Sequence, residues 1–262
     1  MKKLIIRLLV ALVVVVILAV VAVGLFLDGA IKKGVETFGP KLTQVEIKLQ
    51  SVSLSVLSGS GTIKGLVVGN PKGFKMPSAI SVGTATLALK PGSLLSDKII
   101  IKTINVQGPE ITYETDLKHN NLSKILANVQ EATGGGQTEP AKPTEPAQPQ
   151  AAKPAKKLQV DDFVISGAKV YVSVTGPIQG TATIPLPDIH LQNLGTGPDG
   201  ITPAELTKRV LEAIQNGAAQ AASGAMADIS KGAVYLAKDA AGLGTNATDK
   251  VTKGIGGLFK KK

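Results

Sequence analysis

The sequence predicts a mainly β (α+β) protein, in which one twisted antiparallel sheet forms an open groove between an N-terminal transmembrane helix and C-terminal amphipathic helices. Three observations lead to this fold class. A long uncharged apolar run lies near the N-terminus, and many short segments of alternating apolar and polar residues follow it, separated by Gly and Pro. The last quarter is rich in Ala and Gly and has helical periodicity. Alternation with a period of two is typical of strands that bury one face.

The apolar run Leu8–Leu27 contains 20 residues without a charge. At about 1.5 Å per residue it is about 30 Å long, which is the thickness of the hydrocarbon core of a bilayer. A cleaved signal peptide is the alternative, but its apolar stretch is about 7–15 residues long and ends at small residues. Lys2, Lys3 and Arg7 precede the run, so the positive-inside rule places the N-terminus in the cytoplasm. We therefore expect a single-pass protein of the inner (cytoplasmic) membrane with its body in the periplasm.

The rest of the chain divides by composition into further parts. The expected organisation is a cytoplasmic tip (1–7), a transmembrane helix (8–27), the N-terminal part of a β-domain with a short helix (28–132), a disordered Pro/Ala-rich linker (133–157), the C-terminal β part (158–200) and a helical tail (201–262). The linker has five prolines and no residue able to anchor a core, which is typical of disordered, partly polyproline segments.

The alternating segments predict the strands. They are Thr43–Leu57, Gly61–Val68, Ala79–Leu89, Lys98–Val106, Glu110–Thr115, Val160–Ser166, Lys169–Thr175 and Thr181–Leu194. Within the first, the alternation slips by one residue at Gln50–Ser51, which predicts either a β-bulge or a short turn between two strands. The connections contain tight turn signals, and parallel strands would need crossovers of a dozen residues or more, so we expect an antiparallel meander.

Three segments have helical patterns. Asn120–Glu131 predicts a short helix with Leu122, Ile125, Leu126 and Val129 on one face. Thr202-Pro203 predicts the start of a second helix that extends to about Ala222, because Pro is favoured in the first turn. A further amphipathic stretch places Met226, Ile229, Ala233 and Leu236 on one side.

The residue types needed for catalysis are scarce. The chain has no Cys and only two His, His119 and His190. Asp161 and Asp162 are adjacent on a predicted strand, so their carboxylates point to opposite faces and cannot act as an acid–base pair. Gly59-Ser60-Gly61 is interpreted as a hairpin turn, because strand-like residues follow it instead of a helix. We therefore expect no enzyme and no catalytic, metal or cofactor site.

The formal net charge of +10 does not indicate a nucleic-acid-binding protein. The lysines are dispersed, and the aromatic residues (five Phe, three Tyr and no Trp) are not clustered as stacking platforms. Lys260, Lys261 and Lys262 follow Leu258-Phe259 at the end of the chain. Two interpretations stay open for them: contact with an anionic membrane surface, or a solvated tail.

Two longer stretches carry a resemblance to a known family. They read GSGTIKGLVVGNPKGF (Gly59–Phe74) and SAISVGTATLALKPGSLLSDKIIIKTINVQGPEITYE (Ser78–Glu114), and PLPDIHLQNLG followed by GITPAEL adds to them in the second half. Together with the single N-terminal span, this pattern resembles the AsmA-like proteins. The resemblance implies a periplasmic β-rich body, anchored in the inner membrane, with a lipid-lined groove. It also implies a link to phospholipid traffic and to outer-membrane assembly or homeostasis.

The alternating residues supply candidates for such a groove. The set that can line one sheet face is Val45, Ile47, Leu49, Leu54, Val56, Leu87, Leu89, Ile104, Val106, Val170, Val172 and Val174. The expected ligand is a phospholipid or a fatty acyl chain, and the sequence defines no envelope protein partner. The alternative is a structural or scaffolding envelope module whose sheet face is closed by its own helices and which binds no ligand.

Overall fold

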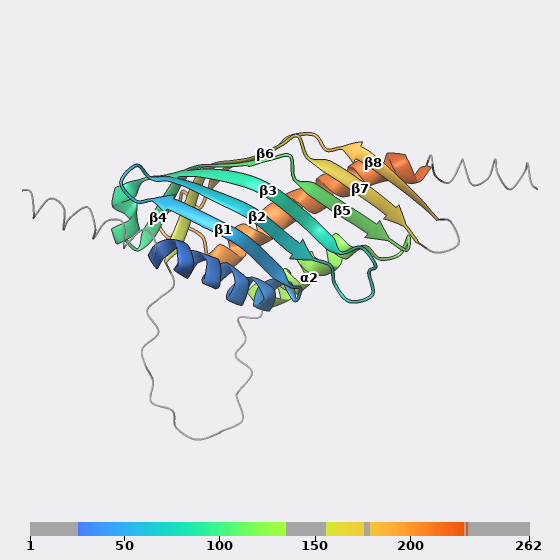
Figure 1. The fold of residues 1–262 in the computed structure, drawn as a ribbon, viewed down its shortest axis with the longest axis horizontal. Coiled ribbons are helices and arrows are strands. Elements are labelled where there is room, and N and C mark those ends of the chain that lie inside the picture. Colours follow the sequence, from blue (N-terminus) through green and yellow to red (C-terminus); the bar gives the residue numbers. More distant parts are fainter. Residues whose placement is uncertain (1–25, 135–155, 176–178, 228, 230–262) are drawn as a thin grey trace, which may run out of the picture.

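One curled sheet dominates the protein. The computed structural model describes residues 26–134, 156–175, 179–227 and 229. This part of the chain contains a nine-stranded sheet, curled into an open half-barrel, with helices on its inner side (Figure 1). Both halves of the sequence, before and after residues 135–155, contribute strands to the same sheet, as predicted.

The observed elements follow the predicted ones, except that the predicted strand Thr181–Leu194 is two strands with a break at residues 186–188. They are β1 (Ile47–Ser55), β2 (Ser60–Gly69), β3 (Ser78–Leu89), the 3₁₀ helix η1 (Pro91–Leu95), β4 (Lys98–Gln107), β5 (Glu110–Thr115), α2 (Asn121–Gly134), β6 (Lys157–Ser166), β7 (Lys169–Val174), β8 (Gly180–Pro185) and β9 (Ile189–Leu194). Two more helices occupy residues 26–43, called the edge helix below, and residues 203–227, called the long helix.

The nine strands form six long runs. β1, β2 and β3 are one run each, and the other three runs are β4 with β5, β6 with β7, and β8 with β9. The run of β4 and β5 pairs with β3 on one side and with the run of β6 and β7 on the other, and the run of β8 and β9 pairs with β6 and β7. The two strands of a run keep the same register toward the neighbouring run. The pairs β4–β6 and β5–β7 are parallel, so the prediction of a purely antiparallel sheet was wrong. The physical reason is that residues 116–156 are long enough to return the chain to the end from which β4 starts.

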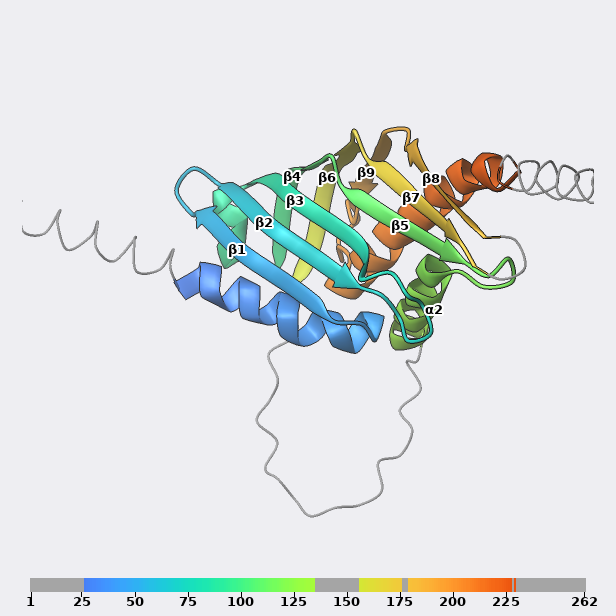
Figure 2. The same ribbon diagram turned by 45° about the vertical axis from the view of Figure 1, so that its right-hand side comes forward.

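A single row of residues bends the sheet. Continuing the observed register through the breaks places six residues side by side, one from each run: Gln50, Gly65, Gly83, Gly108, Gly167 and Pro187. Three of the glycines have positive φ, at 63°, 56° and 62° in chain order, and the inward-facing positions shift by one residue across this row. We call this row the crease. It identifies the slip at Gln50–Ser51 as an irregularity inside one continuous strand, and the bend is visible in Figure 2.

The edge helix covers the outer edge of β1. Asp28 and Glu36 accept hydrogen bonds from the backbone N–H groups of Leu54 (2.8 Å) and Leu49 (3.0 Å), and the Nζ of Lys32 donates to the carbonyl oxygen of Gln50 (3.1 Å). Side chains four residues apart share one helix face, so one polar stripe satisfies a strand edge that would otherwise be open to other chains.

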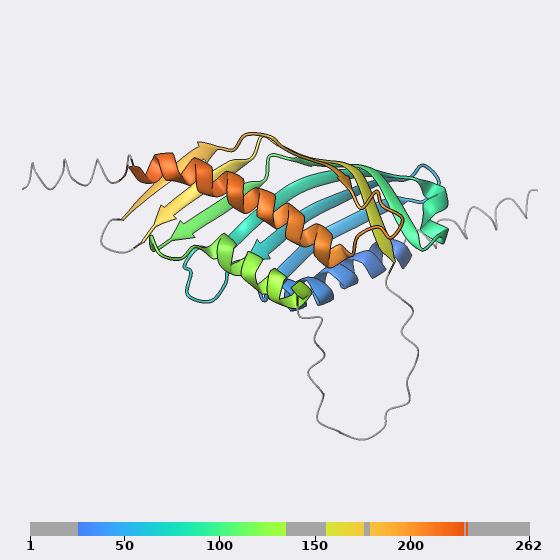
Figure 3. The same ribbon diagram turned by 180° about the vertical axis from the view of Figure 1, so that it is seen from behind.

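α2 and the long helix lie side by side across the inner face of the sheet (Figure 3). Gln215 and Ser123 join them through a 3.3 Å hydrogen bond, and Gln130 and Glu212 through one of 3.4 Å. Their buried apolar residues belong to the same core as the sheet: Leu122, Ile125, Val129, Leu211, Ile214, Ala218 and Ala222. The expected open groove is therefore partly closed by the protein's own helices.

Some predictions concern residues outside the described part. Among the described residues no helix is long and apolar enough to cross a bilayer, and the predicted span lies outside them except for its last two residues. α2 continues to Gly134, two residues into the predicted linker, and most of the remaining linker falls in the range 135–155. Of the last amphipathic stretch, Met226 lies in the long helix, whereas Ala233 and Leu236 are outside the described residues.

Candidate functional site: the inner face of the sheet

The two faces of the sheet differ in chemistry. In β1 and β3 the outward-facing positions beyond the crease hold Ser51, Ser53, Thr84 and Thr86, all exposed. The inward-facing positions are almost all aliphatic and form one core with the helices. The inner face is therefore the surface suited to an apolar ligand.

On one side of the crease the helices cover most of the inner face, and an apolar pocket remains between Ala182 and Ile184 of β8 and Ala221, Gly224, Ala225 and Ile229. Val170, Val172 and Val174 are at most 4% exposed, and Tyr113, which pairs with Val172, is also buried. Burial raises the pKa of the Tyr113 phenol, as expected where the charged form would lose its hydration. The cover is close because it is built from small residues: Gly217 of the long helix has the Leu186 side chain 3.1 Å from the position of a Cβ.

On the other side of the crease the inner face stays partly exposed, at Val52, Ile63 and Ile189 and at the neighbouring row. Cross-strand pairing aligns six residues across the sheet: Leu54, Gly61, Leu87, Ile104, Phe163 and Leu191. We call them the open row. Phe163 and Gly61 are buried, whereas the three leucines and Ile104 are only half-buried. Gly61 lets Leu54 and Leu87 come together, because both side chains lie within about 3 Å of the position of a Cβ there.

The edge helix adds a second apolar surface. Leu27, Ile31, Val35, Phe38 and Leu42 recur at spacings of three and four residues and form a stripe next to the polar stripe that contacts β1. Leu42 packs against the core, and the other members are partly or fully exposed. This stripe and the open row are two of the apolar surfaces in the described part that the long helix and α2 leave accessible.

The twelve predicted groove residues separate into three groups. The strand residues among them all occupy inward-facing positions. Those buried in the folded chain are Val45, Leu49, Leu89, Val106, Val170, Val172 and Val174, and those half-buried are Ile47, Leu54, Leu87 and Ile104. Val56 lies in the turn after β1 and is also half-buried. The structure thus brings the predicted set to one side of the sheet, but only three of them, Leu54, Leu87 and Ile104, belong to the open row.

A buried polar network was missed by the sequence analysis. The side-chain amide of Asn121 accepts a hydrogen bond from the backbone N–H of Glu114 (3.0 Å) and donates to the carbonyl oxygen of Thr112 (2.9 Å). The Glu114 carboxylate in turn accepts hydrogen bonds from the backbone N–H groups of Lys75 (2.7 Å) and Met76 (2.9 Å). Asn70 joins both residues, accepting from Asn121 at 2.7 Å and donating to Glu114 at 3.3 Å. These contacts fix the loop between β2 and β3 against β5, so we assign them a structural role.

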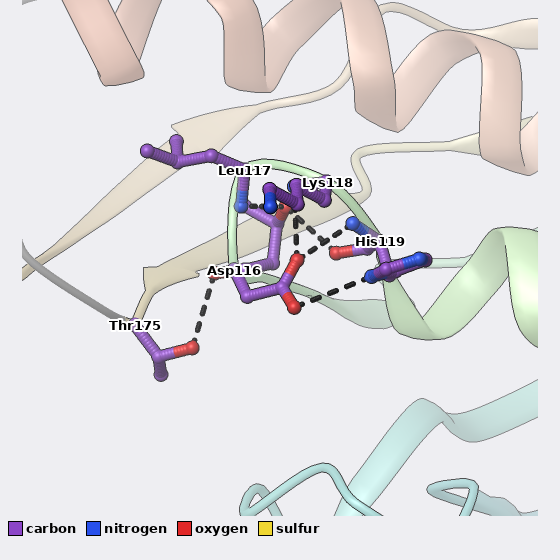
Figure 4. Close-up of polar contacts among 6 residues, drawn as sticks. Asp116, Leu117, Lys118, His119 and Thr175 are labelled. Atoms are coloured by element: carbon purple, nitrogen blue, oxygen red, sulfur yellow. Dashed lines mark hydrogen bonds and ion pairs between the residues drawn. The ribbon is translucent and has the colours of Figure 1, made fainter.

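The two histidines do not form a site. His190 is exposed on β9, and His119 lies in the loop after β5, shown in Figure 4. There the carboxylate of Asp116 accepts hydrogen bonds from the backbone N–H groups of His119 (2.6 Å) and Lys118 (2.9 Å), and these lower the pKa of Asp116 to about 2. A further hydrogen bond, from the N–H of Thr175 to the carbonyl oxygen of Thr115 (2.8 Å), ties the end of β5 to the end of β7.

Comparison with known families agrees with this architecture. The sequence model of the AsmA family matches residues 1–175. The chain belongs to the AsmA family. The family resemblance predicted from the segments Gly59–Phe74 and Ser78–Glu114 is thereby confirmed. Searches among curated proteins and among solved structures give no significant match.

The AsmA match includes most of the sheet but not the long helix that covers it. It covers β1 to β7, and therefore the whole inner face except β8 and β9, whereas the long helix that closes part of this face lies after residue 175. The Asn70-Pro71 pair that contributed to the resemblance has a structural explanation, because Asn70 links Glu114 to Asn121.

Proposed function

We propose that this AsmA-family protein is anchored in the inner membrane with its body in the periplasm, and that it shields lipid acyl chains on the inner face of its sheet. In this role it assists phospholipid traffic or the assembly and homeostasis of the outer membrane. It needs no cofactor and catalyses no reaction.

The observation that carries this proposal is the open row. Folded proteins bury aliphatic side chains where the chain can supply a cover, and here the cover is complete over Val170 and Val172 but incomplete over Leu54, Leu87 and Ile104. An acyl chain placed on this row would gain about 0.8 kcal/mol for each methylene group removed from water. The apolar stripe of the edge helix offers a second surface to the same ligand.

The second candidate function is a structural envelope module without a ligand. The observation that favours it is the cover itself, since α2 and the long helix pack on the inner face and Val170, Val172 and Val174 of β7 are buried. The two functions make different demands on the open row: a ligand needs it apolar, whereas a scaffold tolerates a charge at a half-exposed position.

The experiment that separates them places a charge on each face of the same strand. Leu87→Glu puts a carboxylate into the open row, and Thr86→Glu puts the same group on the exposed outer face one residue away. Binding of a fluorescent fatty acyl probe to the full chain in detergent micelles is measured for the parent and both variants, with far-UV circular dichroism as the check on folding.

We expect the Leu87→Glu variant to stay folded and to lose most of its probe binding, because a charge in an apolar site is costly to desolvate. The Thr86→Glu variant should bind like the parent. Equal binding by all three proteins would contradict the proposal and favour the scaffold. Val172 is unsuitable for this test because it is 1% exposed, so a charge there would unfold the sheet before it could report on a ligand.

A further inference from the structure

The most exposed large apolar side chains of the described part gather at one end of the molecule. Leu95 is 94% exposed, and Leu57 and Phe26 are each 76% exposed. Figure 1 places the β1–β2 turn, η1 and the start of the edge helix together at the left end, and Figure 2 agrees. We call these three residues the apolar tip.

Hydrogen bonds hold the three segments of the tip together. The backbone N–H of Leu89 donates to the carbonyl oxygen of Gly59 (2.7 Å), which joins the β1–β2 turn to the strand that leads into η1. Asp28, two residues after Phe26, accepts from the N–H of Leu54 near the end of β1. The segments that carry the apolar tip are therefore held in place by hydrogen bonds to the sheet.

The path of the chain identifies what this surface faces. The uncharged run Leu8–Leu27 leads directly into the edge helix, and the first described residues of this helix lie at the tip. If the run crosses the membrane, the bilayer surface lies at this end of the body and not at the other. Exposed leucines on turns beside such a span are the residues expected to enter the boundary between headgroups and acyl chains.

We propose that the apolar tip inserts Leu57 and Leu95 into the membrane interface and holds the half-barrel end-on against the bilayer. This proposal rests on the membrane anchor proposed above, and it adds a second contact with the lipid. The segments at this end of the molecule contain four lysines and three aspartates: Lys90, Lys98, Lys156, Lys157, Asp28, Asp97 and Asp199. Because these charges nearly cancel, insertion of the leucines, and not attraction to anionic lipid, is the main contribution.

The absence of Cys from the chain allows a direct test. Single cysteines are introduced as Leu95→Cys, Leu57→Cys and Leu117→Cys, labelled with an environment-sensitive fluorophore, and the full chain is reconstituted into vesicles of phosphatidylethanolamine and phosphatidylglycerol. Leu117 is the matched control, since it is also an exposed leucine (53%) but lies in the loop after β5 at the opposite end. Quenching by a lipid-borne nitroxide is compared with quenching by aqueous iodide.

We expect the labels at 57 and 95 to be quenched by the nitroxide and protected from iodide, and the label at 117 to show the reverse. Vesicle flotation separates the two proposals: a chain that does not float with the vesicles contradicts the anchor, whereas a chain that floats with its label at 95 as open to iodide as the label at 117 contradicts the tip.

A further variant shows that the leucines themselves cause insertion. The fluorophore is attached at Gly92→Cys, where a Cβ would have no neighbour within 4 Å. Nitroxide quenching of this label is compared between the chain with both leucines and the chain that also carries Leu57→Asp and Leu95→Asp. Loss of nitroxide quenching in the aspartate variant is the expected result. Unchanged quenching would overturn the proposal.

Discussion

Asn121 completes the hydrogen bonding of β5 beyond the last residue of β5 that pairs with β3. β3 pairs with β5 only through Ile80 and Ser81, so the side of β5 that faces away from β7 has no strand partner beyond Ile111. The amide of Asn121 takes the place of a neighbouring peptide group there, since it bonds to the N–H of Glu114 and the carbonyl of Thr112. One side chain thus ends the sheet and fixes the start of α2.

Replacing Asn121 should therefore destabilise the whole fold. In Asn121→Ala, two buried backbone groups lose their partners, at about 1–3 kcal/mol for each group left unsatisfied. The control is Asn120→Ala at the preceding residue, where the amide only caps α2 through the N–H of Ser123 and about 1 kcal/mol is expected. Chemical denaturation followed by circular dichroism compares the free energies of unfolding, and equal losses would contradict this role of Asn121.

Asp116 gives a prediction for the pH dependence. The backbone N–H of His119 is the largest cause of its low pKa, ahead of that of Lys118 and of the His119 side chain. Because the pKa is about 2 in the folded chain against an ordinary value of 3.8, the stabilisation is complete above the ordinary value and is lost as the pH falls through the folded value. In His119→Ala the backbone donors remain, so NMR titration of the Asp116 carboxyl should still give a pKa below 3.8. A return to 3.8 would show that the imidazole is the main cause.

At the scale of the elements, the crease explains how the sheet curls. A positive φ favours glycine, and Gly65 has a second constraint, because a Cβ there would lie 2.7 Å from the Cβ of Gln50. Gly83 occupies the same row but has ordinary φ and nothing within 4 Å of a Cβ. Comparing Gly65 with Gly83 therefore distinguishes a glycine that the bend requires from a glycine that merely occurs in a strand.

We predict opposite outcomes for alanine at these two positions. Gly65→Ala should lower the free energy of unfolding by more than the about 1–2 kcal/mol that a left-handed conformation costs an ordinary residue, because the contact with Gln50 adds to it. Gly83→Ala should be neutral, or stabilising by about 0.4–1 kcal/mol through the unfolded chain. Thermal unfolding of the two variants checks this, and a loss at Gly83 equal to that at Gly65 would contradict the crease as a conformational requirement.

The elements differ in how far the sequence predicts them. The strands and α2 follow from periodicity, and the slip at Gln50–Ser51 was a visible trace of the crease. The edge helix was missed because its stripe of Asp28, Lys32 and Glu36 has the composition of a solvent-facing surface, and only the pairing of β1 shows that these groups serve a strand edge. Glu114, near the end of β5, and Asn121, at the start of α2, were missed for a similar reason, since a single polar residue at the end of an element has no periodic signal.

At the scale of the molecule, neither half of the sheet is complete alone. β6 and β7 pair along the whole length of β4 and β5, and this long-range parallel pairing has no local signature in the sequence. The same is true of the cover: whether the Ala-rich long helix lies on the sheet depends on contacts such as Gly217 with Leu186, which spacing alone does not predict. The open row is what remains after that cover is in place.

A fragment should reveal this dependence. Residues 28–132 expressed alone would expose the edge of β4 and β5 and lose the long helix, so we expect an aggregation-prone product. Size-exclusion chromatography with light scattering is the measurement. A monomeric fragment with a cooperative thermal transition would contradict the single-sheet account and indicate two independent units.

The central claim is that lipid occupies the open row, and cross-linking in cells tests it most directly. Cells that express the full chain are fed a fatty acid with a photoactivatable diazirine, irradiated, and the modified peptides are located by mass spectrometry. The account predicts cross-links on the inward-facing residues of β3 and β4, at Leu87 and Ile104, and none on Val172 beneath the helices. Cross-links spread over the outer face, or absent from β3 and β4, would contradict it.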